Sequence, residues 1–178
     1  KSPSSELVYG DITDFSLNRR FDAVVCPFDT INHITSFQLW RKVFENAHRH
    51  LMPGGVFIFD VNTEHKMERY RSDPVTVDFH RGAFSTVSVH RLRRYRYRVD
   101  LTLYREGPRD HFTRHIMSLP ELVVPTPVIL TELSKNFRRV TLIDPDRSRP
   151  CEDTEELFFV CSAPRSDQPV VAAKKRVR

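Results

Sequence analysis

A strand–helix–strand pattern between residues 21 and 60 constrains the fold of this chain more than any other feature. Phe21–Cys26 has the apolar character of a buried strand, Thr35–Leu51 has the period of an amphipathic helix, and Val56–Asp60 reads as a second buried strand. Two such strands joined by a helical crossover belong to a parallel sheet, which binds ligands at the carboxyl ends of its strands. The polar residues that follow the two strands are therefore the first candidates for a functional site.

The segment between the two strands predicts a helix with one buried face. Its apolar side chains recur at spacings of three and four residues: Phe37, Trp40, Phe44, Ala47 and Leu51. We expect Thr35 to cap this helix, with Gln38 completing a capping box, and Pro53-Gly54-Gly55 to end it in a turn. Because the apolar stripe is continuous, we interpret it as core and not as a binding groove.

The order of these segments resembles the second half of the class I methyltransferases, which use S-adenosylmethionine. In that family Gly-Asp follows the third strand, Phe-Asp opens the fourth, and the next helix ends in Leu-Lys-Pro-Gly-Gly before the fifth strand. The counterparts here are Gly10-Asp11, Phe21-Asp22 and Leu51–Gly55, and the match covers about 60 residues by the strand–helix alternation. The resemblance implies an α/β fold with a Rossmann-like, mostly parallel methyltransferase sheet whose last strand is antiparallel.

The glycine-rich loop with which that family binds the methionine part of the cofactor has no counterpart in this sequence. The five glycines are Gly10, Gly54, Gly55, Gly82 and Gly107, which form no phosphate-loop or dinucleotide-type cluster. The sequence also starts at Lys1 and not at a methionine. We therefore expect an N-terminal strand–helix–strand segment, with that loop, to lie outside this numbering.

A change of hydrophobic period marks an insertion after the second strand. From Val75 to Arg105 apolar residues alternate with polar ones, which is typical of antiparallel strands with one solvated face. We interpret residues 73–118 as an inserted antiparallel β ribbon. In the resembling family such strands form a lid over the substrate pocket or a dimer surface, so the resemblance implies one of these two roles and makes a homodimer an expected partner.

The remaining segments complete the predicted domain organisation. Glu6–Tyr9 reads as a short strand, Thr126-Pro127 as the start of a helix over Val128–Phe137, and Val140–Asp144 and Leu157–Ala163 as a final strand pair. The predicted units are residues 1–72 and 119–163 for the core, 73–118 for the ribbon and 164–178 for a disordered basic tail.

Charge and cysteine usage limit the partners and the compartment. The net charge is +5 with a pI of about 9.3, but much of the excess lies in Arg91–Arg98 and Lys174–Arg178. No stacking platform accompanies these clusters, so we interpret them as a solvated strand face and a tail, and nucleic acid is not an expected partner. No apolar run approaches the ~18 residues of a membrane span, and three cysteines without paired spacing favour a reducing, cytoplasmic location.

The resemblance assigns cofactor-binding roles to two loops. It implies that Asp11 accepts a hydrogen bond from the adenine amino group, that Ile12 packs on the ring, and that Cys26, Pro27 and Phe28 meet the methionine end of S-adenosylmethionine. Two structural alternatives stay open from the residues themselves. Asp11 is also a common residue for capping a turn, and Phe28 could fill the core beneath its loop.

The polar residues after the two strands are the candidates for the acceptor side. Methyl transfer from a sulfonium is an in-line displacement, for which the protein mainly aligns the acceptor and excludes water. His33 is the predicted general base and Asn32 its predicted catalytic neighbour, while Asp29, Asp60 and Asn62 are predicted to bind the substrate. The alternative for His33 is a helix-entry or packing residue.

These observations predict methyl transfer from S-adenosylmethionine to an amine or hydroxyl of a small molecule. No metal site is expected, because His111 and His115 lack a helical His-x-x-x-His spacing with an acidic partner. A non-catalytic methyltransferase-like module that lacks the cofactor loop and serves binding or assembly is the alternative. A nucleic-acid methyltransferase or binder that uses Arg91–Arg98 and the basic tail is the third hypothesis.

Overall fold

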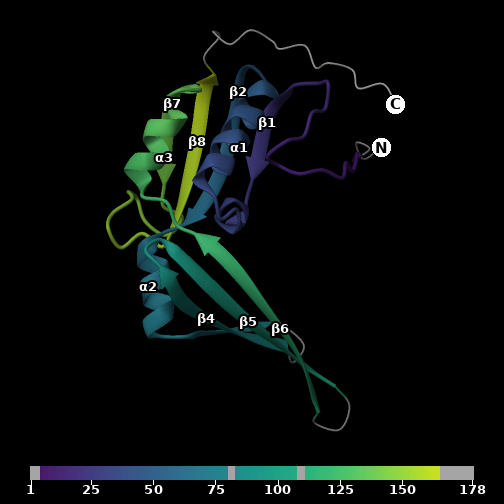
Figure 1. Cartoon of the computed structure of the whole chain (residues 1–178), viewed down its shortest axis with the longest axis vertical. Helices are drawn as coiled ribbons and strands as arrows, with labels where there is room; N and C mark the ends of the chain where they lie inside the picture. Colours follow the sequence, from purple (N-terminus) through teal and green to yellow (C-terminus); the bar gives the residue numbers. More distant parts are fainter. Residues whose placement is uncertain (1–4, 80–82, 108–110, 165–178) are drawn as a thin grey trace.

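Two four-stranded sheets organise the chain, and the second projects away from the first (Figure 1). The computed structural model describes residues 5–79, 83–107 and 111–164. In chain order the elements are β1 (Phe21–Cys26), the 3₁₀ helix η1 (Thr30–His33), α1 (Phe37–Arg49), β2 (Leu51–Asn62), α2 (Glu64–Ser72), β3 (Val75–Phe79), β4 (Ala83–Arg93), β5 (Arg96–Glu106), β6 (Phe112–Leu122), α3 (Thr126–Leu133), β7 (Phe137–Ile143) and β8 (Glu156–Pro164).

The first sheet has the strand order β1-β2-β8-β7. Strands β1 and β2 are parallel, while β8 runs antiparallel to both of its neighbours, β2 and β7. The helical crossover between β1 and β2 and the antiparallel last strand agree with the prediction. The α/β class is thus confirmed, whereas the complete Rossmann-like arrangement stays a prediction.

Helix α1 confirms the predicted crossover but not its expected ends. The residue before its first turn is Ser36, whose side chain makes no capping hydrogen bond, so the capping box predicted for Thr35 and Gln38 does not form. The helix ends at Arg49, and its buried face carries Trp40 and Phe44. The apolar period therefore predicted the buried face of α1 correctly, whereas the capping box predicted from the local sequence was wrong.

The predicted turn before the second strand lies inside β2. Phe21 pairs with Leu51 but Ala23 pairs with Val56, so residues 52–55 form a bulge within the strand. Gly54 adopts a φ of 83°, which favours glycine, and a Cβ on Gly55 would lie 3.0 Å from the Asp22 carbonyl oxygen. The glycines thus allow the chain to turn while it stays at the sheet.

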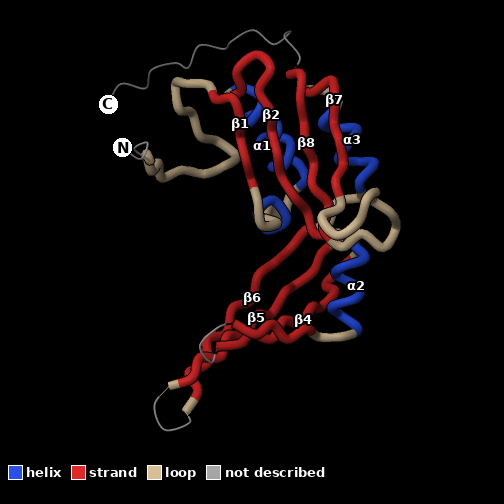
Figure 2. Tube along the Cα trace, turned by 180° about the vertical axis from the view of Figure 1, so that it is seen from behind, coloured by secondary structure: helices blue, strands red, loops and turns tan. Residues whose placement is uncertain are grey.

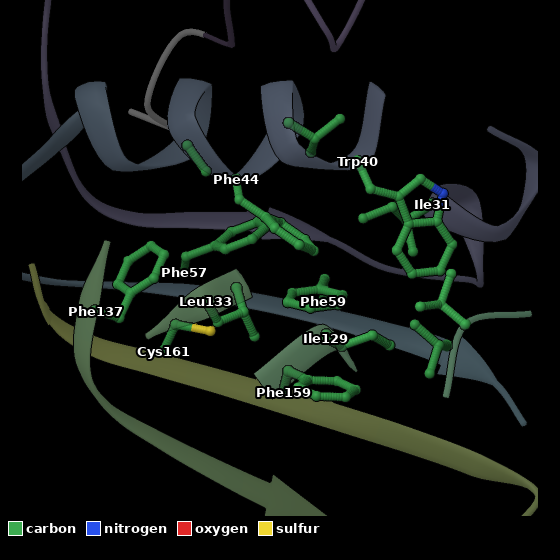
Figure 3. Packing of buried hydrophobic residues seen from close by; sticks show 14 of the residues in the cluster. Ile31, Trp40, Phe44, Phe57, Phe59, Ile129, Leu133, Phe137, Phe159 and Cys161 are labelled. Carbon is green, nitrogen blue, oxygen red and sulfur yellow. The ribbon is translucent and has the colours of Figure 1, made fainter. Parts of the chain in front are cut away.

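The hydrophobic core lies on one face of the first sheet, beneath α1 and α3, which Figure 2 shows on the same side of the strands. Phe57 and Phe59 of β2 stand opposite Cys161 and Phe159 of β8. Phe59 and Phe159 stack with ring centroids 4.8 Å apart. Figure 3 shows the residues that close over these rings: Trp40 and Phe44 from α1, Ile129 and Leu133 from α3, and Phe137 from β7.

The second sheet is fully antiparallel, in the order β3-β4-β5-β6. This confirms the alternating period, although β6 continues to Leu122, beyond the predicted end at residue 118. Helix α2, which was not predicted from the sequence, packs on the second sheet through Met67, against Val89 of β4 and Tyr97 of β5. Since Met67 is its one buried residue, α2 lacks the apolar stripe that would reveal it.

Other predicted boundaries need correction. The structure has no strand at Glu6–Tyr9, where Leu7 and Tyr9 are exposed. Helix α3 has Pro125 and not Thr126 as its N-cap, and it ends at Leu133, because Phe137 already belongs to β7. The predicted tail lies outside the described residues from position 165 onward. None of the helices in the described part of the chain is long and apolar enough to cross a membrane.

Candidate functional site

The carboxyl ends of β1 and β2 meet the end of β6 where the two sheets join (Figure 1). The loop after β1 turns sharply there, with positive φ angles at Phe28 (62°) and Asp29 (47°). Two consecutive non-glycine residues with positive φ angles are uncommon, and such strained backbone concentrates at functional sites. The loop leads directly into η1, which carries Asn32 and His33.

Asp60 at the end of β2 holds the β1 loop in place. Its Oδ2 accepts a 2.7 Å hydrogen bond from the backbone N–H of Asp29. Asp60 is buried, and its Oδ1 accepts no hydrogen bond from the described residues. A buried carboxylate oxygen without a partner is costly, which points to a functional constraint at this position.

Asn32 and Asn62 interlock η1, β2 and β6. The Asn32 side chain accepts a hydrogen bond from the Asn62 N–H (3.0 Å) and donates to the carbonyl oxygens of Asn62 (3.3 Å) and Leu122 (3.0 Å). Asn32 is completely buried, and these bonds to backbone groups use both the amide nitrogen and the amide oxygen of its side chain. The structure therefore shows Asn32 as a structural clamp, and its predicted catalytic role stays untested.

The side chain of Asn62 bridges two carboxylates. Its Nδ2 donates to Asp29 Oδ2 (2.8 Å) and to Glu121 Oε2 (3.2 Å), while its Oδ1 accepts a 2.7 Å hydrogen bond from Lys66 Nζ. Asp29 comes from the β1 loop, Lys66 from α2 and Glu121 from β6. One buried amide thus orients groups from three separate elements.

His33 lies at the open side of this cluster. Its Nε2 is 3.8 Å from Asp29 Oδ2, and the side chains of His33 and Asp29 are 37% and 29% exposed. Potential ligand atoms of Asp29, His33 and Glu121 lie within 4.8 Å of one another, a set that could also hold a metal ion. The cluster thus combines a solvent-accessible imidazole with two oriented carboxylates.

Burial dominates the electrostatics of the carboxylates. Desolvation raises the pKa of Asp29 and of Glu121, although the hydrogen bond from Asn62 acts in the opposite direction in both cases. The pKa of Glu156 is raised as well, first by burial and further by the nearby Asp60. The cluster therefore holds acidic groups that a hydrogen-bond donor or a cation would stabilise in the charged form.

Three of the five predicted cofactor residues lie at a separate cavity of about 230 Å³, whereas Asp11 and Phe28 do not line it. Ile12, Cys26 and Pro27 line it together with apolar residues of β1 and α1. Burial raises the pKa of Cys26 to about 11, so this residue stays a neutral thiol. The mostly apolar walls suit a flat, weakly polar ring.

The structure tests the two structural alternatives, that Asp11 caps a turn and that Phe28 fills the core beneath its loop. Asp11 Oδ1 accepts hydrogen bonds from the Thr13 N–H and hydroxyl, both at 2.8 Å, so Asp11 does cap a turn. These bonds lower the pKa of its exposed carboxyl. Phe28 is 83% exposed and does not fill the core. Their predicted roles toward the cofactor remain untested.

Sequence reasoning missed Glu121 and Lys66. Glu121 lay just beyond the predicted ribbon, and Lys66 lay on the unpredicted helix α2. The available signal was the environment of Glu121, a single charge within the apolar run Leu119–Val124. Such a charge at the end of a strand is either paired or functional, because an isolated buried charge is costly.

No protein-family profile matches the chain. Over 60 residues it is 37% identical to dTDP-3-amino-3,6-dideoxy-alpha-D-glucopyranose N,N-dimethyltransferase of Streptomyces fradiae, a match over 34% of this chain and 24% of that protein. It is 36% identical over 58 residues to dTDP-4-amino-2,3,4,6-tetradeoxy-D-glucose N,N-dimethyltransferase of Saccharopolyspora spinosa, a match over 33% and 23% of the two chains.

Solved structures extend the similarity to most of the described fold. An S-adenosylmethionine-dependent methyltransferase from Clostridium acetobutylicum superimposes with a TM-score of 0.77 and 21% identity, over 89% of this chain and 65% of the other. The chain has the methyltransferase fold. The sugar N-methyltransferase KedS8 of a Streptoalloteichus species shares this fold with a TM-score of 0.64 and 18% identity, over 85% and 60% of the two chains.

The methyltransferase fold confirms the family resemblance that the sequence predicted. The chain spans less than two thirds of the length of these solved structures, and its match to the curated relatives spans about a quarter of their length.

Proposed function

We propose that this chain forms the acceptor side of an S-adenosylmethionine-dependent N-methyltransferase whose substrate is the amino group of a small molecule, an amino sugar being the favoured class. The observation that carries the proposal is the cluster around Asp29 and His33 at the carboxyl ends of β1 and β2. It occupies the position at which sheets of this kind bind their ligands. The names of the two curated relatives, both sugar N,N-dimethyltransferases, support the amine.

The cofactor fits the cavity beside β1. Ile12 in its wall suits the adenine ring, Asp11 in the adjoining loop offers a carboxylate to the adenine amino group, and Cys26 and Pro27 are proposed to meet the methionine end. When bound, S-adenosylmethionine supplies an electrophilic methyl group on a sulfonium. Phe28, which is exposed on the loop between the cavity and the cluster, is positioned to shield the reacting atoms from water.

His33 serves as the proton acceptor in this proposal. His33 Nε2 would accept one proton from the acceptor nitrogen, whose lone pair would then be free to take the methyl group that the bound cofactor supplies as its carbon–sulfur bond breaks. Asp29, 3.8 Å away, stabilises the resulting imidazolium. Asp60 and Asn62 act through Asp29, since both hydrogen-bond to it.

The second sheet supports two roles that remain proposals. Val77 and Met117, which are 41% and 50% exposed, lie on the same apolar face of this sheet. We propose that a second copy of the chain covers this face in a homodimer, and sedimentation analysis would test it.

The alternative role of the second sheet is a lid over the acceptor. The free cysteines Cys26, Cys151 and Cys161 are consistent with the proposed reducing, cytoplasmic location.

A methyl-transfer assay with a matched pair of acceptors tests the proposed function. The full-length protein is incubated with labelled S-adenosylmethionine and either dTDP-3-amino-3,6-dideoxy-α-D-glucopyranose or the same sugar nucleotide with a hydroxyl at carbon 3. We expect label in the amine only. Transfer to the hydroxyl analogue at an equal rate would contradict N-methylation. Absence of transfer to an amino-sugar panel, together with absence of cofactor binding, would favour the non-catalytic module.

A further inference from the structure

We propose that Glu121, delivered by β6 of the second sheet, is an acceptor-binding residue that together with Asp29 receives the positively charged form of the acceptor amine. The inference rests on the proposed function and deepens it. It assigns the selection of a cationic amine over a neutral hydroxyl to a pair of carboxylates. It also gives the second sheet a direct part in the acceptor site.

The placement of Glu121 is the first argument. The residue is only 3% exposed, yet its carboxylate receives a single hydrogen bond from the described part of the chain, the 3.2 Å bond from Asn62 Nδ2 to Oε2. One of its carboxylate oxygens lies within 4.8 Å of a carboxylate oxygen of Asp29 and of a ring nitrogen of His33. A buried carboxylate that accepts one hydrogen bond and makes no ion pair within the described residues retains unused acceptor capacity beside Asp29 and His33.

The chemistry of the neighbouring groups is the second argument. The Asn62 amide places one nitrogen donor between Asp29 Oδ2 and Glu121 Oε2, so the remaining carboxylate oxygens are available to further N–H donors. Carboxylates gather around Lys66 and His33: Asp29, Asp60, Glu121 and Glu156. Because the acidic groups outnumber the basic ones here, a bound ammonium group reduces the excess of negative charge.

The geometry favours an ammonium group over a metal ion. The shared Asn62 nitrogen already occupies the space between the two carboxylates with a hydrogen-bond donor, and Lys66 Nζ lies 2.7 Å from Asn62 Oδ1. A metal ion held by both carboxylates and His33 would face this amide N–H donor, which cannot act as a metal ligand. An ammonium group instead donates hydrogen bonds, which the carboxylate oxygens that are not bonded to Asn62 can accept.

An NMR titration of the full-length protein tests the inference without knowledge of the natural acceptor. The side-chain amide signal of Asn62 is the reporter, because its nitrogen contacts both carboxylates. The probes are methylammonium, tetramethylammonium and methanol, at constant ionic strength with EDTA present. We expect saturable shifts with methylammonium only, and about tenfold weaker binding in Glu121→Gln, which keeps an oxygen for Asn62 but loses the charge.

Glu132→Gln serves as the control. Glu132 is also nearly buried, but it belongs to α3 and pairs with Arg41 and Lys135, so its substitution should leave methylammonium binding unchanged. Equal responses to methylammonium and tetramethylammonium, or equal binding by the parent and Glu121→Gln, would overturn the inference. A separate titration with S-adenosylhomocysteine distinguishes the two proposals. Methylammonium binding without cofactor binding would leave the cation site intact and refute the methyltransferase.

Discussion

His33 is the residue on which the proposed proton transfer depends. We expect His33→Ala to lower kcat by about 10²-fold or more, as loss of a general base does, while the Kd for S-adenosylhomocysteine stays unchanged. His65 is a matched control, because its ring also lies 3.8 Å from a carboxylate, that of Asp153, with a similarly exposed side chain (38% against 37%). If His65→Ala and His33→Ala lower kcat equally, the assignment of the base is wrong.

Asp11 combines a turn-capping role with the proposed cofactor role, and two variants separate them. Asp11→Asn retains an oxygen for the Thr13 bonds, whereas Asp11→Ala loses it. We expect both variants to weaken S-adenosylhomocysteine binding severalfold, because each loses the charged hydrogen-bond acceptor that is proposed for the adenine amino group. Calorimetry measures this, and weakening in Asp11→Ala alone would show that only the turn matters.

Glu121 makes the stability of the fold depend on pH. Since burial raises its pKa in the folded chain, the folded state binds this proton more tightly than the unfolded state. Its contribution is therefore present at low pH and is lost as pH rises from the ordinary glutamate range through the raised pKa. Asp29 and Glu156 contribute with the same sign.

We expect Glu121→Gln to reduce the fall in Tm between acidic and neutral pH and to be at least as stable as the parent near neutrality. Glu132→Gln should instead lose stability there, because Glu132 is ion-paired. Thermal denaturation over a pH series compares the two variants with the parent. A steeper decline of Tm with pH in Glu121→Gln than in the parent would contradict a raised pKa for Glu121.

At the scale of elements, Asn32 joins η1 to β2 and β6 through three hydrogen bonds to backbone groups. Asn32→Ala leaves these buried groups unsatisfied, and we expect it to lower the free energy of unfolding by about 2 to 4 kcal/mol. The exposed Gln38→Ala should change it by less than about 0.5 kcal/mol. Denaturant unfolding measures both, and a near-neutral Asn32→Ala would show that the clamp carries little energy.

The elements also show which sequence signals predict structure. Apolar runs and periodicity located β1, α1, β2, β7 and β8, because burial of those side chains drives the fold. Local turn chemistry was less reliable. The Pro53-Gly54-Gly55 segment was predicted to end a helix but forms a bulge in β2. Helix α2 was missed because its stability depends on packing against the second sheet, which one sequence segment does not reveal.

At the scale of the whole molecule, the candidate site joins residues that are far apart in the chain. The sequence could place Asp29, His33, Asp60 and Asn62 together, because parallel strands end at the same edge of a sheet. It could not place Glu121, since the contact between the end of β6 and Asn62 spans 59 residues and arises from the way the two sheets meet. Long-range contacts of this kind follow from topology.

The central claim is that this methyltransferase fold carries an active cofactor and acceptor site. Calorimetric titration of S-adenosylhomocysteine into the full-length protein tests it most directly. We predict saturable micromolar binding that Asp11→Asn weakens and His33→Ala leaves unchanged. Absence of binding by the parent protein would contradict this claim and assign the chain to the non-catalytic, methyltransferase-like modules.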